Sequence, residues 1–166
     1  VAAIKDQIEK LMVCHMSTYN TARSIMLKKL SKVVPSGLDK FFFSNSGAEA
    51  VETALKFSRK FSGKPGVISM NGGYHGKTFG ALSITSSEKY RKPFEPLLDY
   101  IKFVPYGNTS KLVDAIDDKT GTVILEPVQG ESGIIMPPAG FIQEVREICS
   151  RHSLVLIFDE IQSGFG

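Results

Sequence analysis

Two carboxylates and an amide follow a short apolar run near the end of the sequence. Residues 154–158 are all apolar, and Asp159, Glu160 and Gln162 occupy three of the next four positions. A continuous apolar run of this length is typical of a strand that is buried on both faces of a parallel sheet. Ligands of such sheets bind beyond the carboxyl ends of the strands. We therefore expect Asp159 to lie in a functional site.

A second group of residues could bind an anion. Ser46 and Glu49 are three positions apart, the spacing of a capping box, so a helix is expected to begin near Gly47. The free N–H groups and the positive end of the helix dipole would then face the same edge of the sheet. Gly47 has no side chain, so an anion could approach the backbone closely, and a phosphate is the natural ligand. An ordinary well-capped helix is the alternative.

A glycine-rich loop presents an aromatic ring and a histidine. Tyr74 and His75 lie between glycines after an apolar run, which indicates that they are displayed rather than packed. Residues 76–78 read Gly-Lys-Thr, as in a P-loop, and the acid after the last apolar run would then hold magnesium. The P-loop pattern, however, needs glycine where Asn71 stands. A nucleotide hydrolase and a plain surface position for Lys77 both stay open as alternatives.

Polar residues also follow the apolar run 122–125. Glu126, Gln129 and Glu131 are expected at the same sheet edge as Asp159, in a segment where a proline and two glycines permit tight turns. This group offers too little nitrogen or sulfur for zinc, although an oxygen-only magnesium site and a hydrated polar loop both stay possible. We assign no metal ligand here.

Composition points to one globular α/β domain. The 166 residues are 42% hydrophobic and 22% charged, and the net charge of +3 favours a solvated surface over a nucleic-acid-binding one. Two cysteines, Cys14 and Cys149, are too few for a disulfide scaffold and favour a cytoplasmic setting. No apolar run is long enough to span a bilayer. The absence of Met at Val1 suggests that an earlier segment is missing.

Helical and extended patterns alternate along the chain, which predicts a mainly parallel sheet with helices packed on it. We expect two parts, an N-terminal helical segment at 1–40 and an α/β core at 41–166. The expected helices are 2–12, 25–34, 48–61, 112–116 and 141–151, and the expected strands are 41–43, 67–70, 101–104, 122–125 and 154–158.

Together these segments resemble the class III pyridoxal-phosphate (PLP) aminotransferases, in the family's order and over nearly the whole chain. The matching blocks are Asn45-Ser46-Gly47-Ala48-Glu49-Ala50, Gly73-Tyr74-His75-Gly76-Lys77, Glu126-Pro127-Val128-Gln129-Gly130-Glu131 and residues 158–166. Residues 89–94 and 104–108 look closest to putrescine aminotransferases, with acetylornithine, ornithine and 4-aminobutyrate aminotransferases near. The resemblance implies the large domain of a fold type I PLP transferase, with helices on both faces of the sheet.

The resemblance also implies roles for individual residues. Asp159 would pair with the protonated ring nitrogen of the cofactor, Glu131 would be the family's gate carboxylate, and Lys77 would lie near the substrate where many relatives carry Arg. Tyr74 and Ile161 would contact the two flat faces of the ring, and Gln162 its hydroxyl group. The implied catalytic residues are Asp159 and Glu131, the substrate-binding residues Lys77 and Glu131, and the cofactor-binding residues Ser46, Gly47, Ala48, Tyr74, His75, Glu126, Asp159, Ile161 and Gln162.

The resemblance implies a transaminase that moves nitrogen from an amine or omega-amino donor to a 2-oxo acid such as 2-oxoglutarate. The donor would be of the putrescine, ornithine, acetylornithine or 4-aminobutyrate type. The family's Schiff-base lysine and its small domain are expected outside this sequence. A cytoplasmic homodimer without nucleic-acid or membrane partners is expected. A P-loop-like nucleotide hydrolase and a non-catalytic fragment of an aminotransferase are the alternatives.

Overall fold

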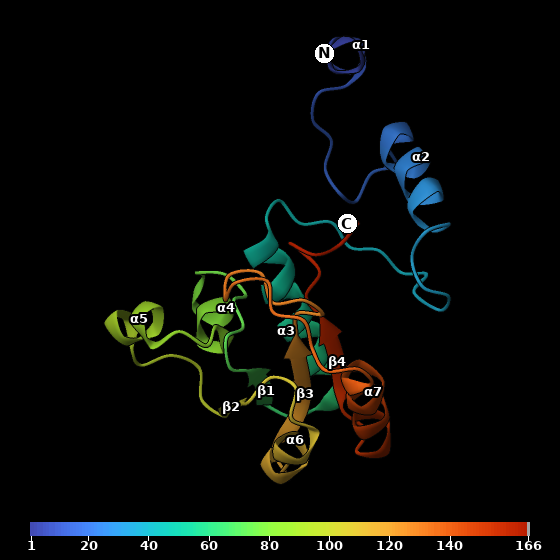
Figure 1. Ribbon diagram of the computed structural model, residues 1–166. Coiled ribbons are helices and arrows are strands. Elements are labelled where there is room, and N and C mark those ends of the chain that lie inside the picture. Colours follow the sequence, from blue (N-terminus) through green and yellow to red (C-terminus); the bar gives the residue numbers. More distant parts are fainter. Residues whose placement is uncertain (166) are drawn as a thin grey trace. The chain divides into compact units, whose positions relative to one another are not determined.

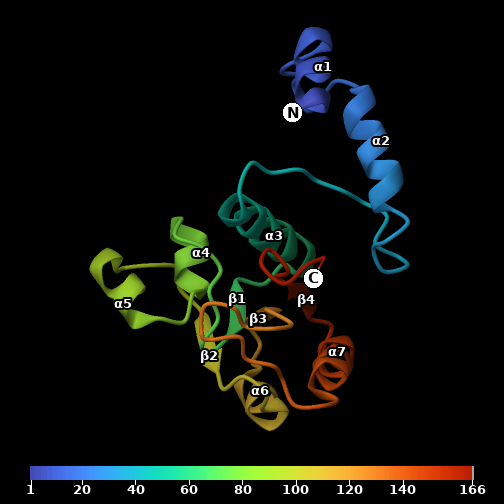
Figure 2. The ribbon, with the colours of Figure 1, turned by 45° about the horizontal axis from the view of Figure 1, so that its top comes forward.

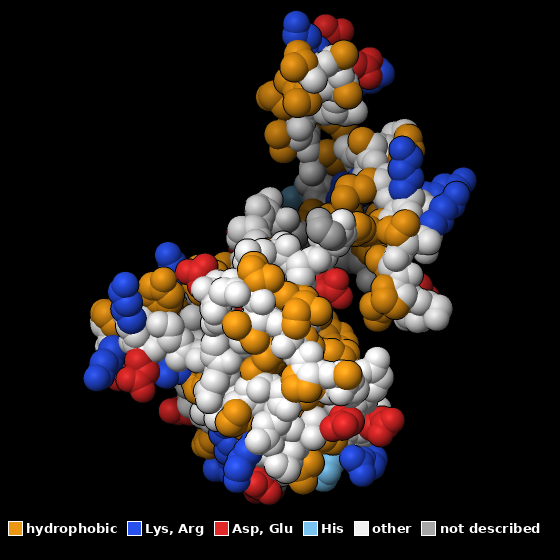
Figure 3. Space-filling view, viewed as in Figure 1, with side chains coloured by type: hydrophobic (Ala, Val, Ile, Leu, Met, Phe, Trp, Pro, Cys, Tyr) orange, Lys and Arg blue, Asp and Glu red, His pale blue; other side chains and the backbone are white. Residues whose placement is uncertain are grey.

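The computed structural model describes residues 1–165 and divides the chain into two compact units, Val1–Phe43 and a second that begins at Ser44. The first unit contains α1 (Ala2–Lys10) and α2 (Thr21–Leu30), and neither helix buries a residue. Apolar side chains lie on the surface of both helices in the view of Figure 3. The helix expected at 25–34 starts four residues earlier, because the side chain of Asn20 caps α2 by accepting from the Arg23 N–H at 2.9 Å.

The strand expected at 41–43 is wrong. Within the described chain these three phenylalanine residues belong to no strand of the sheet. A strand exists only where a neighbour offers its backbone N–H and C=O groups. The apolar run here therefore indicates a preference for extended backbone and does not produce a strand by itself.

The second unit is built on a sheet of four parallel strands. These are β1 (Gly66–Met70), β2 (Ile101–Val104), β3 (Thr120–Leu125) and β4 (Val155–Phe158), in the order β2-β1-β3-β4 (Figure 1). The expected parallel sheet is confirmed. The chain passes from β1 to β2 on one side and then to β3 on the other, so the strand order reverses next to β1. Ligands of open α/β sheets bind at such a switch point, beyond the carboxyl ends of the strands.

Helices cover both faces of this sheet. The helices α3 (Gly47–Ser62) and α4 (Phe79–Ile84) pack on one face, and α6 (Thr109–Ala115) and α7 (Phe141–Arg151) pack on the other (Figure 2). Side chains alternate along each strand, so Val67 faces α3 while Ile68 faces α7. The core next to α3 and α4 consists of Val51, Leu55, Val67, Ala81, Ile84 and Ile124, and the core next to α6 and α7 is larger.

Two features differ from expectation. The strand β4 is half-buried rather than buried on both faces, and Phe158 at its end is 38% exposed, because β4 forms an edge of the described sheet. The short helices α4, α5 (Glu88–Arg91) and η1 (Lys92–Phe94) were not expected. Helix α4 contains glycine and ends on β-branched residues, so packing against α3 rather than intrinsic propensity stabilises it. Within residues 1–165, no helix is long and apolar enough to cross a membrane.

Candidate functional site

The end of β4 delivers a buried carboxylate to the switch-point edge. Strand register aligns Phe158 with Leu125, and the Asp159 N–H continues the ladder by donating to the Leu125 carbonyl at 2.9 Å. The Asp159 side chain is 4% exposed. Its Oδ1 accepts from the Ile161 N–H at 3.1 Å, and its Oδ2 lies 2.7 Å from Nδ1 of His75. The carboxylate therefore has a fixed direction even though it lies just beyond an edge strand.

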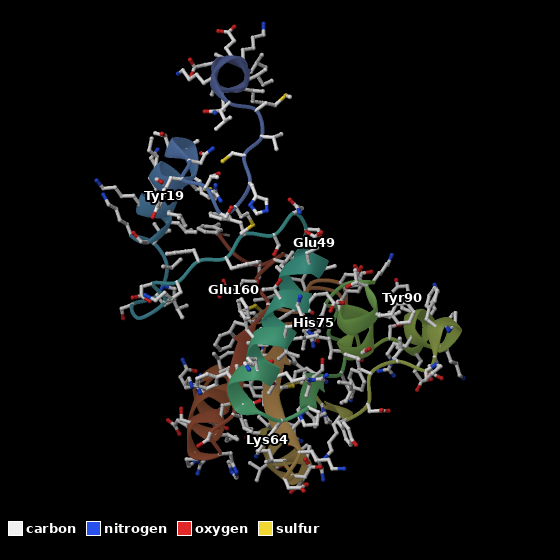
Figure 4. All side chains as sticks on the ribbon, turned by 180° about the vertical axis from the view of Figure 1, so that it is seen from behind. Tyr19, Glu49, Lys64, His75, Tyr90 and Glu160 are labelled. Carbon is white, nitrogen blue, oxygen red and sulfur yellow. The ribbon has the colours of Figure 1, made fainter. Side chains whose placement is uncertain are left out.

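His75 supports Asp159 from the glycine-rich loop. Its side chain is fully buried, and its backbone N–H donates to the Thr85 hydroxyl at 2.9 Å. A carboxylate only accepts hydrogen bonds, so Nδ1–H is the donor to Asp159. The other ring nitrogen, Nε2, is buried and has no partner within residues 1–165. In Figure 4 His75 lies in the interior between α3 and α4, and it orients the acid instead of facing solvent.

A second buried carboxylate joins two loops of the site. Glu126 follows β3 and is 5% exposed. It accepts from the Tyr74 N–H at 2.8 Å and from the Gly130 N–H at 3.0 Å, so it fixes the loop after β1 to the loop after β3. The Tyr106 hydroxyl donates to the backbone carbonyls of Glu126 and Pro127 at 3.0 and 2.9 Å. Burial and the charge of Glu126 raise the pKa of Tyr106 to about 12.

The N-terminus of α3 contributes free hydrogen-bond donors. The expected capping pair forms with one partner shifted: Ser46 Oγ accepts from the Glu49 N–H at 3.2 Å, while the Glu49 carboxylate accepts at 2.7 Å from the N–H of Asn45, the residue before the N-cap. The N–H groups of Gly47 and Ala48 have no acceptor within residues 1–165. An added Cβ at Gly47 would lie 2.9 Å from the Ile161 side chain, so the absence of a side chain permits this close packing.

These groups surround one pocket of about 320 Å³, within the usual size range of small-molecule sites. Two expected site residues do not line it. Ser46 caps α3 beside the pocket, and the exposed Glu131 lines a neighbouring hollow of about 280 Å³ that shares Tyr74 with it. The residues lining the main pocket are Gly47, Ala48, Tyr74, His75, Gly76, Lys77, Glu126, Asp159, Ile161 and Gln162.

Two residues at or beside the pocket, Tyr90 and Gly76, were not assigned to the site from the sequence. The ring of Tyr90 on α5 meets that of Tyr74 edge-on, with centroids 6.2 Å apart, and the Lys77 ammonium lies 5.5 Å from the Tyr90 centroid. In Figure 4 the labelled Tyr90 lies at the periphery of the second unit. Gly76 has φ +124°, and an added Cβ would lie 2.9 Å from that of Ala48. The glycine signal was readable in the motif, whereas nothing local marks Tyr90.

The arrangement does not support a P-loop. Helix α4 is six residues long, and the N–H groups of Gly80 and Ala81 at its start already donate to the carboxylate of Glu52. A P-loop would offer such donors to a phosphate. Among the described residues, no group of three or more His, Cys, Asp or Glu side chains could hold a metal ion. The free donors and the oriented acid lie instead at α3 and Asp159.

Comparisons with curated proteins agree on one family. The chain is 48% identical over 166 residues to an acetylornithine aminotransferase of Methanopyrus kandleri, covering 100% of this chain and 43% of that protein. It is 44% identical over 167 residues to a [LysW]-aminoadipate semialdehyde transaminase of Deinococcus radiodurans, covering 99% of this chain and 39% of that protein. The chain thus spans about two-fifths of the length of these relatives.

Solved structures show the same fold. An adenosylmethionine-8-amino-7-oxononanoate aminotransferase of Methanocaldococcus jannaschii superposes with a TM-score of 0.92 at 32% identity, covering 99% of this chain and 41% of that one. An ornithine aminotransferase of Toxoplasma gondii, described with partial occupancy of PLP at its active site, gives a TM-score of 0.89 at 29% identity, covering 98% and 40%. The expected fold type I architecture is confirmed. The family model for "Aminotransferase class-III" matches residues 1–166, and the chain belongs to that family.

Proposed function

We propose that this chain forms the cofactor-binding side of a PLP-dependent aminotransferase. The observation that carries the proposal is the buried Asp159, which His75 and a backbone N–H orient at the edge of a pocket that also contains a free helix N-terminus. Class-III membership supports PLP as the cofactor. PLP supplies an aromatic ring that accepts electrons from the substrate carbon, and the protein binds and orients it.

The donors and walls of the pocket fit this cofactor. The unpaired N–H groups of Gly47 and Ala48 and the positive end of the α3 dipole suit a phosphate dianion, with Ser46 holding the cap in place. Tyr74 and Ile161 suit the two flat faces of the ring, and Ile161 packs against Gly47 in a way that keeps it at the pocket wall. Gln162, next to Gly130, would bind the ring hydroxyl.

Asp159 would carry the central electrostatic task. A carboxylate paired with the ring nitrogen keeps that nitrogen protonated, and this favours electron flow into the ring. The His75 Nδ1–H bond and the Ile161 N–H bond prevent the carboxylate from rotating away. Glu126 already accepts two backbone N–H bonds, so we assign it to holding the Tyr74 loop rather than to direct chemistry.

Substrate binding would involve Lys77 and Glu131. Lys77 lines the pocket, and its ammonium lies 5.5 Å from the Tyr90 ring centroid, so we assign it to binding a substrate carboxylate. The exposed Glu131 is free to serve as the gate carboxylate. The relatives support an amine donor of the ornithine or acetylornithine type. We propose putrescine and 4-aminobutyrate as further donor candidates and a 2-oxo acid such as 2-oxoglutarate as the acceptor.

The remaining parts of the enzyme are also proposals. Lys77 is the lysine that lines the pocket within residues 1–165. We assign Lys77 to the substrate, and the resemblance to the family implies that the lysine that holds the cofactor covalently and moves the proton lies outside this sequence. We assign residues 1–40 to the N-terminal helical segment of the large domain and 41–166 to its cofactor-binding core. A homodimer in the cytoplasm completes the proposal.

Asp159→Ala in the complete enzyme tests the function. We expect a loss of at least about a hundredfold in turnover with 2-oxoglutarate and a panel of amine donors, because the ring nitrogen loses its partner. The fold should persist, as measured by far-UV circular dichroism. Near-wild-type turnover would refute the role of Asp159. Wild-type protein that is protected from proteolysis by ATP and not by PLP would refute the proposed function itself.

A further inference from the structure

One face of α3 connects the pocket to the start of α4. Ala48 and Glu52 are four residues apart, so they lie on the same face of α3, one turn from each other. Ala48 lines the pocket and packs against Gly76, while Glu52 reaches the first turn of α4. This face therefore contacts residues 76–81, at Gly76 through Ala48 and at the start of α4 through Glu52.

Glu52 makes three hydrogen bonds to that segment through one carboxylate oxygen. Its Oε1 accepts from the Thr78 hydroxyl at 2.6 Å, from the Gly80 N–H at 2.8 Å and from the Ala81 N–H at 3.1 Å. The N-cap residue of α4, Thr78, makes no capping bond to its own helix. Glu52 thus satisfies the N-terminus of α4 from a neighbouring helix, and its charge complements the dipole there.

The backbone is shaped to admit this carboxylate. An added Cβ at Gly80 would collide with Glu52 Oε2. An added Cβ at Gly76 would lie 2.9 Å from the Ala48 Cβ and 3.1 Å from the Ala81 Cβ. The two glycines therefore bring α3 and the segment 76–81 into close contact at two points. The Glu52 carboxylate bridges the second point through its hydrogen bonds to Thr78, Gly80 and Ala81.

The contacts of Glu52 affect the proposed cofactor pocket. The loop that carries Tyr74, His75 and Lys77 is fixed at its start by Glu126, which binds the Tyr74 N–H, and just beyond its end by Glu52. We propose that Glu52 is a positioning residue for the cofactor site: it sets the distance between the α3 N-terminus, which would bind the phosphate, and the loop that would contact the ring. This inference rests on the proposed function.

Two variants of the complete enzyme, Glu52→Ala and Glu52→Gln, test the inference after the cofactor has been removed. Each is titrated with PLP by fluorescence quenching, and the bound cofactor is measured by visible circular dichroism. Glu52→Ala should weaken PLP binding about tenfold and reduce the dichroic signal, since a displaced wall misplaces the groups that bind the cofactor. Glu52→Gln keeps an acceptor oxygen and should lie between Ala and wild type. Faster amide hydrogen exchange at Gly80 and Ala81 should accompany both.

A matched control separates positioning from stability alone. Asp117 also accepts backbone and hydroxyl hydrogen bonds, from Lys119 and Thr120, but it lies just before β3 at the amino end of the strands. Asp117→Ala should lower the unfolding midpoint while leaving PLP affinity within about twofold, as expected for a site far from the pocket.

The outcomes are distinct. The inference is overturned if both Glu52 variants bind PLP with wild-type affinity and dichroism, or if Asp117→Ala weakens PLP binding as much as Glu52→Ala does. If Glu52→Ala does not fold, Glu52→Gln alone decides between the intermediate and the wild-type result. Failure of the proposed function would look different, because the complete wild-type enzyme would then bind no PLP.

Discussion

Replacing Glu126 with glutamine should destabilise the second unit although the side chain keeps its size. Glu126 is 5% exposed and its two oxygens each accept one backbone N–H, from Tyr74 and from Gly130. In Glu126→Gln the amide NH₂ must face one of these donors. One buried N–H is then left unsatisfied, at about 1–3 kcal/mol, and the remaining bond loses its charge assistance, at about 1 kcal/mol.

The expected loss in the free energy of unfolding is therefore about 2–4 kcal/mol, measured by urea denaturation with a common m-value. Glu144→Gln serves as the control, because Glu144 is exposed and accepts a single bond from the Thr109 hydroxyl. That control should change stability by less than about 0.5 kcal/mol. A Glu126→Gln variant as stable as the control would show that the two N–H groups find water or other acceptors, and the bracing role of Glu126 would fail.

Two further predictions concern pH. The pKa of Tyr106 is raised from 10.0 to about 12, so its neutral form stabilises the folded state fully below pH 10.0, and this contribution is lost as the pH rises through about 12. Tyr106→Phe should remove this contribution from unfolding curves measured at alkaline pH. An unchanged dependence of stability on pH would contradict the prediction. Hydrogen bonds from Lys102 and Thr120 hold the pKa of Asp117 well below its usual range, so its stabilising effect is present above about pH 4 and is lost on acidification. Asp117→Asn should flatten the acid limb of the unfolding profile, and an identical acid limb would count against the assigned bonds.

Periodicity and local chemistry were sufficient for most elements near the site. Helix α7 has the expected bounds, and β1, β2 and β3 begin within two residues of expectation, because each is an apolar run that ends at polar or turn residues. The capping box of α3 was readable because both of its partners lie in one short segment. The sheet edge that gathers the acids follows from parallel strands alone.

The features that were missed depend on distant parts of the chain. Residues 41–43 have the composition of a strand but form no ladder in the described chain. Helix α4 has weak intrinsic propensity and depends on Glu52, which is 26 residues before Thr78 in the sequence. Tyr90 reaches Tyr74 only through the fold. The half-buried state of β4 likewise follows from its place in the strand order, which no local pattern encodes.

The register of β4 on β3 makes the position of Asp159 sensitive to the insertion or deletion of a single residue in β4. Leu125 lies opposite Phe158, so the next positions of the two strands deliver their acids side by side. Side chains alternate between the faces of a sheet, and a slip of one residue would therefore turn Asp159 away from His75. An insertion of one residue within 155–158 should therefore separate Asp159 from His75 while leaving much of the hydrophobic core in place. The same insertions in the turn before Leu154 could be absorbed, so indel tolerance should change abruptly at the first residue of this strand.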